Sequence, residues 1–218
     1  MNAYEQRHAK RYALSLEAVR PYLCAGAKIL ELGGSSAFGK KLAALPDLSL
    51  RVDFTSSDLR HPWPSLQKGE ASQSDIALCM EVIEHIHDRE TKPFATEWMG
   101  TGTANLLEET FRLLKPGGLL FLTTPNAASL NVLYKALMQE PPMIYRPHVR
   151  EYAPHELAAL VQAAGFERIT VTSHDCWDND CVPPADLALL RSVIGRLGYR
   201  TDCRGEDLFL TAFKPASK

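Results

Sequence analysis

The chain has 218 residues, of which 45% are hydrophobic and 23% are charged, and its formal net charge is -2. This length and composition are typical of one globular domain with a sizeable core, so we expect a single domain over 1–218. The charge balance provides no basic field of the kind that nucleic acid demands. No apolar run approaches the roughly 20 residues of a membrane span, and no signal peptide is visible, so we expect a cytoplasmic protein.

The five cysteines are odd in number and widely spaced, which argues against a disulfide framework and favours reduced thiols. Two of them lie in the segment from Ser173 to Cys181, beside His174. This segment lacks the paired short spacings of a zinc site, so we interpret it as a polar loop.

Hydrophobic periodicity predicts helices and strands that alternate along the chain. The predicted strands are KILEL (28–32), LSLRVDFT (48–55), DIALCM (75–80), LLFLTT (119–124), FERITVTS (166–173) and DLFLTAF (207–213). The predicted helices cover 3–23, 36–45, 104–115 and 153–166.

Proline and glycine mark several of these boundaries. Pro116 and the two glycines after it are expected to end the helix 104–115, and Pro154 and Gly165 to bound the helix 153–166. Apolar strands that alternate with helices predict an α/β fold, with a doubly wound, mostly parallel sheet covered on both faces in three α/β/α layers.

The segment KILELGGSSAFGKKLAAL, residues 28–45, joins a predicted strand to a predicted helix through Gly33 and Gly34. Ligands of doubly wound sheets bind outside the carboxyl ends of the strands, and glycine lets the backbone approach a ligand closely. A dinucleotide site would carry G-x-G-x-x-G, which this chain lacks. Glu31 instead suits a ligand with an ammonium group, although a plain tight turn is the alternative.

Four motifs occur in order: ILELGG, DIALCMEVIEHI, LLKPGGLLFLTTPN and HVREYAPHELAALVQAAGFERI. Together they resemble the class I S-adenosylmethionine-dependent methyltransferases, particularly the small-molecule group related to the ubiquinone-biosynthesis type. The resemblance covers roughly residues 28–172. It implies S-adenosyl-L-methionine as the cofactor and a Rossmann-like sheet of six or seven strands whose C-terminal strand is antiparallel.

The resemblance also implies roles for the first motif. Glu31 matches the acid that meets the cofactor's amino group through water or nearby backbone, and Gly33, Gly34 and Ser35 lie where the methionine part is admitted. Ser35 and Ala37 stand where the family carries further glycines.

Further cofactor contacts follow from the later motifs. Asp53 fits the acid that pairs the ribose hydroxyls, with Asp58 as its rival. Asp58 and Leu59, in DLRHPWP, resemble the segment beside adenine, and Met80 and Glu81 resemble the residues beside the sulfonium.

A hydroxyl acceptor would benefit from a general base, and histidine has a suitable pKa near neutrality. His148, in YRPHVREY, is the candidate, and a histidine bonded to a helix start is the alternative. Glu84 and His85 form a single Glu-His pair that caps backbone equally well, so we expect no metal. The N-terminal helix, the loop 127–152 and the insert 174–206 are expected to flank the acceptor.

The leading hypothesis is a methyltransferase that acts on a hydroxyl oxygen of a small organic acceptor by in-line displacement. A catalytically silent, methyltransferase-like interaction protein is the alternative, because Ser35 and Ala37 replace glycines. A nicotinamide-dependent oxidoreductase ranks third, since it would use the same glycine turn.

Overall fold

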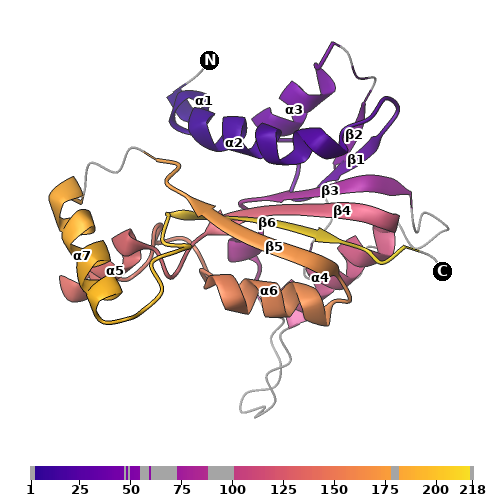
Figure 1. Ribbon diagram of the computed structural model, residues 1–218. Helices are drawn as coiled ribbons and strands as arrows, with labels where there is room; N and C mark the ends of the chain where they lie inside the picture. Colours follow the sequence, from indigo (N-terminus) through magenta and orange to yellow (C-terminus); the bar gives the residue numbers. More distant parts are fainter. Residues whose placement is uncertain are drawn as a thin grey trace.

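The computed structural model describes residues 3–46, 48, 50–54, 59, 73–87, 101–177 and 182–216 of the chain. Helices and strands alternate along it, as expected (Figure 1). The described strands are β1 (Lys28–Glu31), β2 (Arg51–Phe54), β3 (Ser74–Met80), β4 (Leu114–Pro125), β5 (Glu167–His174) and β6 (Asp207–Phe213). The described helices are α1 (Ala3–Arg7), α2 (Ala9–Val19), η1 (Arg20–Tyr22), α3 (Ala37–Ala43), η3 (Ile83–His85), α4 (Thr101–Leu113), α5 (Leu130–Leu137), α6 (Pro154–Ala163) and α7 (Pro184–Arg196).

Within the described residues, six strands form one sheet in the order β2-β1-β3-β4-β6-β5. The pairs β1–β2, β1–β3 and β3–β4 are parallel, whereas β6 runs antiparallel to both β4 and β5. This confirms the predicted mostly parallel sheet with an antiparallel C-terminal strand. The carboxyl ends of β1, β3 and β4 and the start of β6 therefore meet at one edge.

Helices cover both faces of the sheet (Figure 1). On one face, α4 and α6 contribute Leu106 and Leu157 to a core that includes Leu120 of β4. On the other, α2 and α3 contribute Tyr12 and Phe38 to a core that includes Phe121. Successive side chains of a strand point to opposite faces, so a continuous apolar run in β4 supplies both cores.

Local signals explain where several helices begin and end. The Ser36 side chain accepts hydrogen bonds from the backbone N–H groups of Phe38 and Gly39 and caps α3. Pro154 occupies the first turn of α6, and Gly165 follows that helix with φ +98°. The predicted roles of Pro154 and Gly165 are confirmed.

Two predicted boundaries were wrong. The N-terminal helix is divided into α1, α2 and η1 rather than continuous over 3–23. Helix α4 ends at Leu113, and β4 begins at the next residue, so Pro116 and Gly117 lie in a strand instead of a turn. The pairing with β3 slips there, and Gly117 has φ +78°, because an irregular strand start accommodates proline and glycine.

Two helices were missing from the sequence interpretation. The loop 127–152 contains α5, which Ser129 caps through a hydrogen bond from the Val132 N–H. The insert 174–206 contains α7, in which Ile194 is the one buried residue. Both helices lie at one end of the molecule, beyond the sheet (Figure 1). Their short buried stripes explain why periodicity alone did not reveal them.

The four cysteines within the described residues, Cys24, Cys79, Cys176 and Cys203, are free thiols. In the described part of the chain, no helix has the length and apolarity needed to span a bilayer.

Asn126 ties the end of β4 to the loop that precedes β6. Its buried amide donates to the carbonyl oxygens of Cys203 and Gly205, the latter at 2.7 Å, and its Oδ1 accepts from the Ala128 N–H. This side chain therefore connects backbone segments that are far apart in the sequence.

We predict that Asn126→Ala lowers the free energy of unfolding by about 2 to 4 kcal/mol, because it leaves buried backbone groups without partners. Urea unfolding of the wild type and the variant measures this change. Gln162→Ala, on the exposed side of α6, is the control and is expected to change stability by less than about 0.5 kcal/mol. Equal midpoints for Asn126→Ala and the control would contradict the proposed tie.

Candidate cofactor and acceptor site

The glycine turn after β1 has the backbone conformation that the sequence predicted. Gly33 and Gly34 have φ +82° and +106°, in the region that favours glycine. A Cβ at Gly33 would stand 2.7 Å from Val82 Cγ2, whereas one at Gly34 would meet nothing within 4 Å. The turn thus packs against Val82, just after β3, on one side and leaves bare backbone beside open space on the other.

Glu31 holds this turn from inside. Its side chain is buried, its Oε2 accepts the Ser36 N–H at 3.0 Å, and its Oε1 accepts the Ser36 hydroxyl. A side chain at Gly39 would collide with the carboxylate. The acid therefore fixes the backbone next to Gly34, consistent with contact to a cofactor through nearby backbone.

Asp53 lies on β2, opposite Leu30 of β1, near the same sheet edge as Glu31. Its side chain is 55% exposed, and its Oδ2 is 2.8 Å from Arg51 Nε. A ribose contact would thus replace or share this surface ion pair. The rival acid, Asp58, lies outside the described residues. Leu59 is buried, and its carbonyl accepts a hydrogen bond from Asn105 Nδ2 at 3.1 Å.

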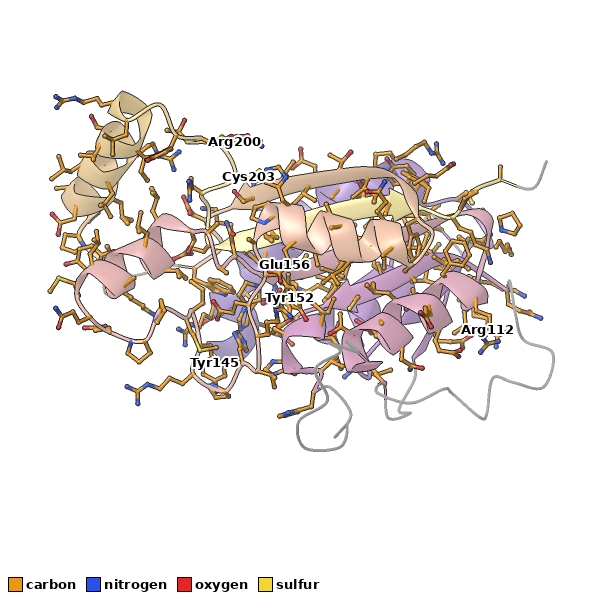
Figure 2. All side chains as sticks on the ribbon, turned by 90° about the horizontal axis from the view of Figure 1, so that it is seen from below. Arg112, Tyr145, Tyr152, Glu156, Arg200 and Cys203 are labelled. Atoms are coloured by element: carbon orange, nitrogen blue, oxygen red, sulfur yellow. The ribbon has the colours of Figure 1, made fainter. Side chains whose placement is uncertain are left out.

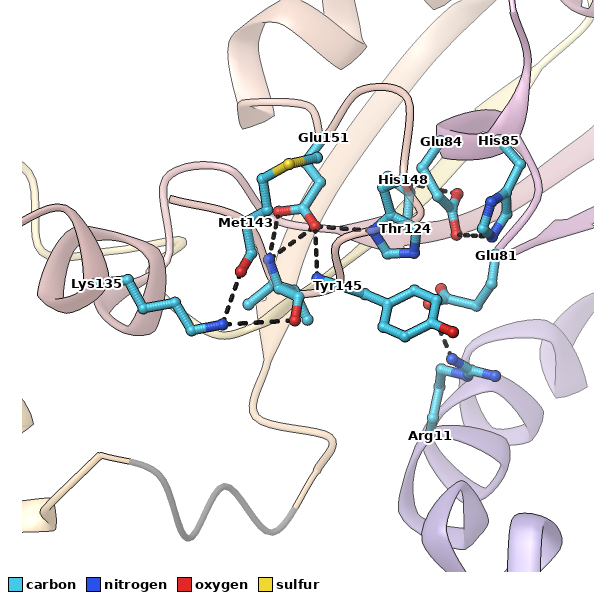
Figure 3. A network of polar contacts seen from close by, with 11 residues as sticks. Arg11, Glu81, Glu84, His85, Thr124, Lys135, Met143, Tyr145, His148 and Glu151 are labelled. Carbon is cyan, nitrogen blue, oxygen red and sulfur yellow. Dashed lines mark hydrogen bonds and ion pairs between the residues drawn. The ribbon is translucent and has the colours of Figure 1, made fainter. Parts of the chain in front are cut away.

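Met80 ends β3, and Glu81 follows it in a left-handed conformation with φ +55°. This conformation is unusual for a residue with a side chain. Two contacts hold it. Thr123 Oγ1 donates to Glu81 Oε1 at 2.8 Å, and Arg11 Nη1 is 2.9 Å from Oε2 (Figure 3). Arg11 is buried and comes from α2, so the N-terminal helix helps to build the site.

Two further acids near Glu81 are fully buried. Thr124 Oγ1 donates to Glu84 Oε2 at 2.9 Å, but Glu84 Oε1 has no hydrogen-bond partner among the described residues. Both carboxyl oxygens of Asp207, at the start of β6, likewise lack a donor among the described residues, and this side chain interacts with the Glu81 carboxylate. Burial, followed by the neighbouring Glu81 carboxylate, raises the pKa of both Glu84 and Asp207. This edge of the sheet therefore favours either bound protons or an added cation.

His148 is held by Glu151. The Nδ1 atom of the histidine is 2.8 Å from Glu151 Oε1, and the two side chains are only 7% and 3% exposed. Glu151 also accepts the backbone N–H groups of Ile144 and Tyr145. With Nδ1 engaged, Nε2 is the ring nitrogen left for a proton or a metal ion.

The His148 ring lies against His85, with ring centroids 4.8 Å apart (Figure 3). Glu84, His85 and His148 place one candidate ligand atom each within 4.8 Å of one another. Sequence reasoning considered the Glu-His pair and His148 separately and missed their meeting. It also missed Arg11, Glu151 and Asp207, of which only Glu151, three residues after His148, gave a local signal.

The N-terminal helix meets the start of the insert. Trp177 Nε1 donates to His8 Nδ1 at 3.2 Å. Burial, and then Arg11 and Arg7, lower the pKa of His8 to about 4, so its neutral ring accepts this bond. By contrast, Tyr145 and Tyr199 are more than half exposed. Figure 2 shows Tyr145 at the end of the molecule that carries α5.

A separate pocket of about 340 Å³ lies between the start of α6 and the loop before β6, lined in part by Pro154, Arg200 and Cys203. Figure 2 labels Arg200 and Cys203. None of the predicted cofactor residues lines it. Its Arg200 is already paired with Asp202, and its Arg204 donates to the Ala128 carbonyl. We therefore assign the chemistry to the sheet edge rather than to this pocket.

A family profile described as a methyltransferase domain matches residues 4–171 of the chain. The chain therefore belongs to the methyltransferase-domain family. A probable S-adenosylmethionine-dependent methyltransferase of Mycolicibacterium smegmatis is 28% identical over 159 residues, which are 66% of this chain and 53% of that protein. A ubiquinone biosynthesis O-methyltransferase of Psychrobacter cryohalolentis is 24% identical over 50% of this chain and 36% of its own length. The chain thus spans about half or less of these relatives.

Solved structures share the fold. A SAM-dependent methyltransferase of Archaeoglobus fulgidus has a TM-score of 0.62 at 15% identity, covering 97% of this chain and 98% of that one. Phosphoethanolamine N-methyltransferase 2 of Haemonchus contortus, in complex with S-adenosyl-L-methionine, has a TM-score of 0.52 at 16% identity, covering 93% and 52%. Family and fold together identify a methyltransferase domain that shares the fold of solved methyltransferases described as dependent on, or bound to, S-adenosyl-L-methionine.

The residues present fit that cofactor. The bare backbone at Gly34 faces open space, and the buried Glu31 carboxylate fixes the turn around it.

We predict that Glu31→Ala weakens S-adenosylhomocysteine binding by about tenfold or more, because a charge-assisted hydrogen bond contributes about 1.5 to 3 kcal/mol. Calorimetric titration measures the affinity, and circular dichroism checks that the fold survives. Glu140→Ala, at an exposed position after α5, is the matched control and is expected to bind like the wild type. Wild-type affinity in Glu31→Ala would exclude a role of this acid in the cofactor site.

The ribose assignment has its own test. If Asp53 binds the ribose hydroxyls, Asp53→Ala should weaken S-adenosylhomocysteine by about tenfold or more, while Asp58→Ala leaves the affinity unchanged. The same titration compares the two variants. A loss confined to Asp58→Ala would transfer the ribose contact to Asp58.

Proposed function

We propose that the chain transfers the methyl group of S-adenosyl-L-methionine to a hydroxyl oxygen of a small organic acceptor. The observation that carries this proposal is the His148–Glu151 pair at the sheet edge, 2.8 Å apart and nearly buried. The His148 ring lies against His85. Burial, followed by the neighbouring His148, lowers the pKa of His85, and the nearby Glu81 carboxylate partly opposes that shift. The family resemblance sets the sulfonium beside Glu81.

The division of labour among the residues follows from the chemistry. When bound, S-adenosyl-L-methionine supplies a methyl group on a positively charged sulfur, so holding the acceptor in line provides much of the rate. Glu31, Gly33 and Gly34 shape the turn for the cofactor's methionine part. Glu151 accepts a hydrogen bond from the Nδ1–H group of His148. This leaves Nε2 free to remove the proton of an acceptor hydroxyl.

Hydroxyl chemistry is favoured over other acceptors on two grounds. A neutral alcohol is a poor nucleophile, so a base that removes its proton assists the transfer. An unprotonated amine is a good nucleophile and needs no such base. In addition, relatives named ubiquinone biosynthesis O-methyltransferase match half of the chain. We also propose that residues 1–218 form a single domain. The acceptor side is bordered by α2 and by the start of the insert 174–206, which meet where Trp177 donates a hydrogen bond to His8.

A screen of small hydroxylated acceptors with S-adenosyl-L-methionine tests this function, with product mass and S-adenosylhomocysteine release as readouts. For a methylated acceptor, His148→Ala should lower kcat by about 100-fold or more, while S-adenosylhomocysteine affinity stays unchanged. His155→Ala, an exposed histidine on α6, is the matched control and should retain kcat.

Three results would argue against the proposal. Wild-type kcat in His148→Ala would remove the base. A methyl group found only on nitrogen or carbon would contradict the hydroxyl acceptor. Failure of the wild type to bind S-adenosylhomocysteine would favour the catalytically silent alternative.

A further inference from the structure

We propose that Glu84, His85 and His148 form a binding site for one divalent transition-metal ion. Their candidate ligand atoms lie within 4.8 Å of one another, and Glu84 Oε1 is 3.9 Å from His85 Nε2. Ligands of a single zinc-sized ion are about 3 to 4 Å apart, given metal–ligand distances near 2 Å. Side-chain adjustments of less than about 1 Å would therefore bring all three onto one ion.

Glu84 supplies an observation independent of the clustering. Its side chain is fully buried, Thr124 holds Oε2, and Oε1 has no hydrogen-bond partner in the described part of the chain. A buried carboxylate oxygen without a partner is costly, and a coordinated cation removes that cost. The open oxygen faces His85, which is the geometry that an ion between them requires (Figure 3).

The backbone holds the three ligands together. The Glu84 carbonyl accepts the Val149 N–H at 2.9 Å, so the loop that carries His148 is attached to the turn that carries Glu84 and His85. Glu151 bonds the Nδ1 of His148 and is itself held by the Ile144 N–H. A carboxylate on the far nitrogen of a histidine is the usual way to orient a metal-bound imidazole.

The donor set indicates the kind of metal. Two imidazoles and one carboxylate suit Zn²⁺, Mn²⁺ or Fe²⁺ better than the all-oxygen cations Mg²⁺ and Ca²⁺. Glu81 does not belong to the set, because Arg11 and Thr123 already engage both of its oxygens. Three protein ligands leave positions for water or substrate, and the half-exposed His85 opens the site to solvent.

With the metal absent, His148 Nε2 keeps the role of base proposed above. With the metal bound, Nε2 is a ligand, and the metal would lower the pKa of an acceptor hydroxyl bound to it, whose proton would leave to solvent on the half-exposed His85 side. This role rests on the proposed O-methyl transfer, whereas the existence of the metal site does not.

Cobalt binding tests the site without any turnover. A tag-free full chain, treated with EDTA and dialysed, is titrated with Co²⁺ while its visible absorption is recorded, and Zn²⁺ is then added in competition. We expect one equivalent of Co²⁺ to produce a ligand-field band that Zn²⁺ removes. Glu84→Gln, His85→Ala and His148→Ala should each weaken Co²⁺ by at least about tenfold, and Glu151→Gln by about 10- to 100-fold.

His155→Ala serves as the matched control, because this exposed histidine lies outside the cluster. Circular dichroism and S-adenosylhomocysteine affinity should remain those of the wild type in every variant, which separates metal loss from unfolding. Absence of a cobalt band in the wild type, or a cobalt affinity in His85→Ala and His148→Ala equal to that of the wild type, would overturn the metal site.

The outcomes also separate this inference from the proposed function. A bound metal without methylation of any hydroxyl would keep the site and reject the O-methyl transfer. Unchanged kcat after EDTA treatment, together with no cobalt band, would reject the site and keep the methyl transfer.

Discussion

The burial of several carboxyl groups at one edge of the sheet determines which residues must surround them. Glu81, Glu84 and Asp207 interact with one another there, and Arg11 offsets Glu81 at 2.9 Å. A buried carboxylate that lacks a partner costs several kcal/mol, so each acid must be paired, protonated or matched by a cation. Glu81 is paired, the pKa of Asp207 is raised, and Glu84 keeps one oxygen open toward two histidines.

The scaffold makes this concentration of charge tolerable. Strands β4 and β6 supply Thr123 and Asp207, and Glu81 follows directly after the end of β3 at the same edge of the sheet. Helix α2 contributes Arg11, which pairs with Glu81. The same helix packs on the core through Tyr12, which stacks on Phe38 with ring centroids 5.9 Å apart. The N-terminal helix is thus part of the site as well as of the core.

The features predictable from sequence were those with short-range signals. Apolar runs identified the strands, Gly33 and Gly34 marked the turn, and Pro154 and Gly165 bounded α6. Helix α7 escaped because a single buried residue, Ile194, gives no periodic stripe.

Long-range partnerships were beyond the same reasoning. Arg11 with Glu81, and His148 with Glu84 and His85, join segments far apart in the sequence, and only the strand order brings them together. The Glu-His pair by itself resembled a backbone cap, and His148 by itself resembled an isolated base. Their combined meaning depends on a distance that no sequence pattern supplies.

The central claim is that the turn built by Glu31, Gly33 and Gly34 holds the methionine part of a methyl donor and not a dinucleotide. Calorimetric titration of the full chain with S-adenosylhomocysteine and, separately, with NADH tests it most directly. The account predicts saturable one-to-one binding of S-adenosylhomocysteine and no binding heat with NADH. Saturable NADH binding without S-adenosylhomocysteine binding would contradict it.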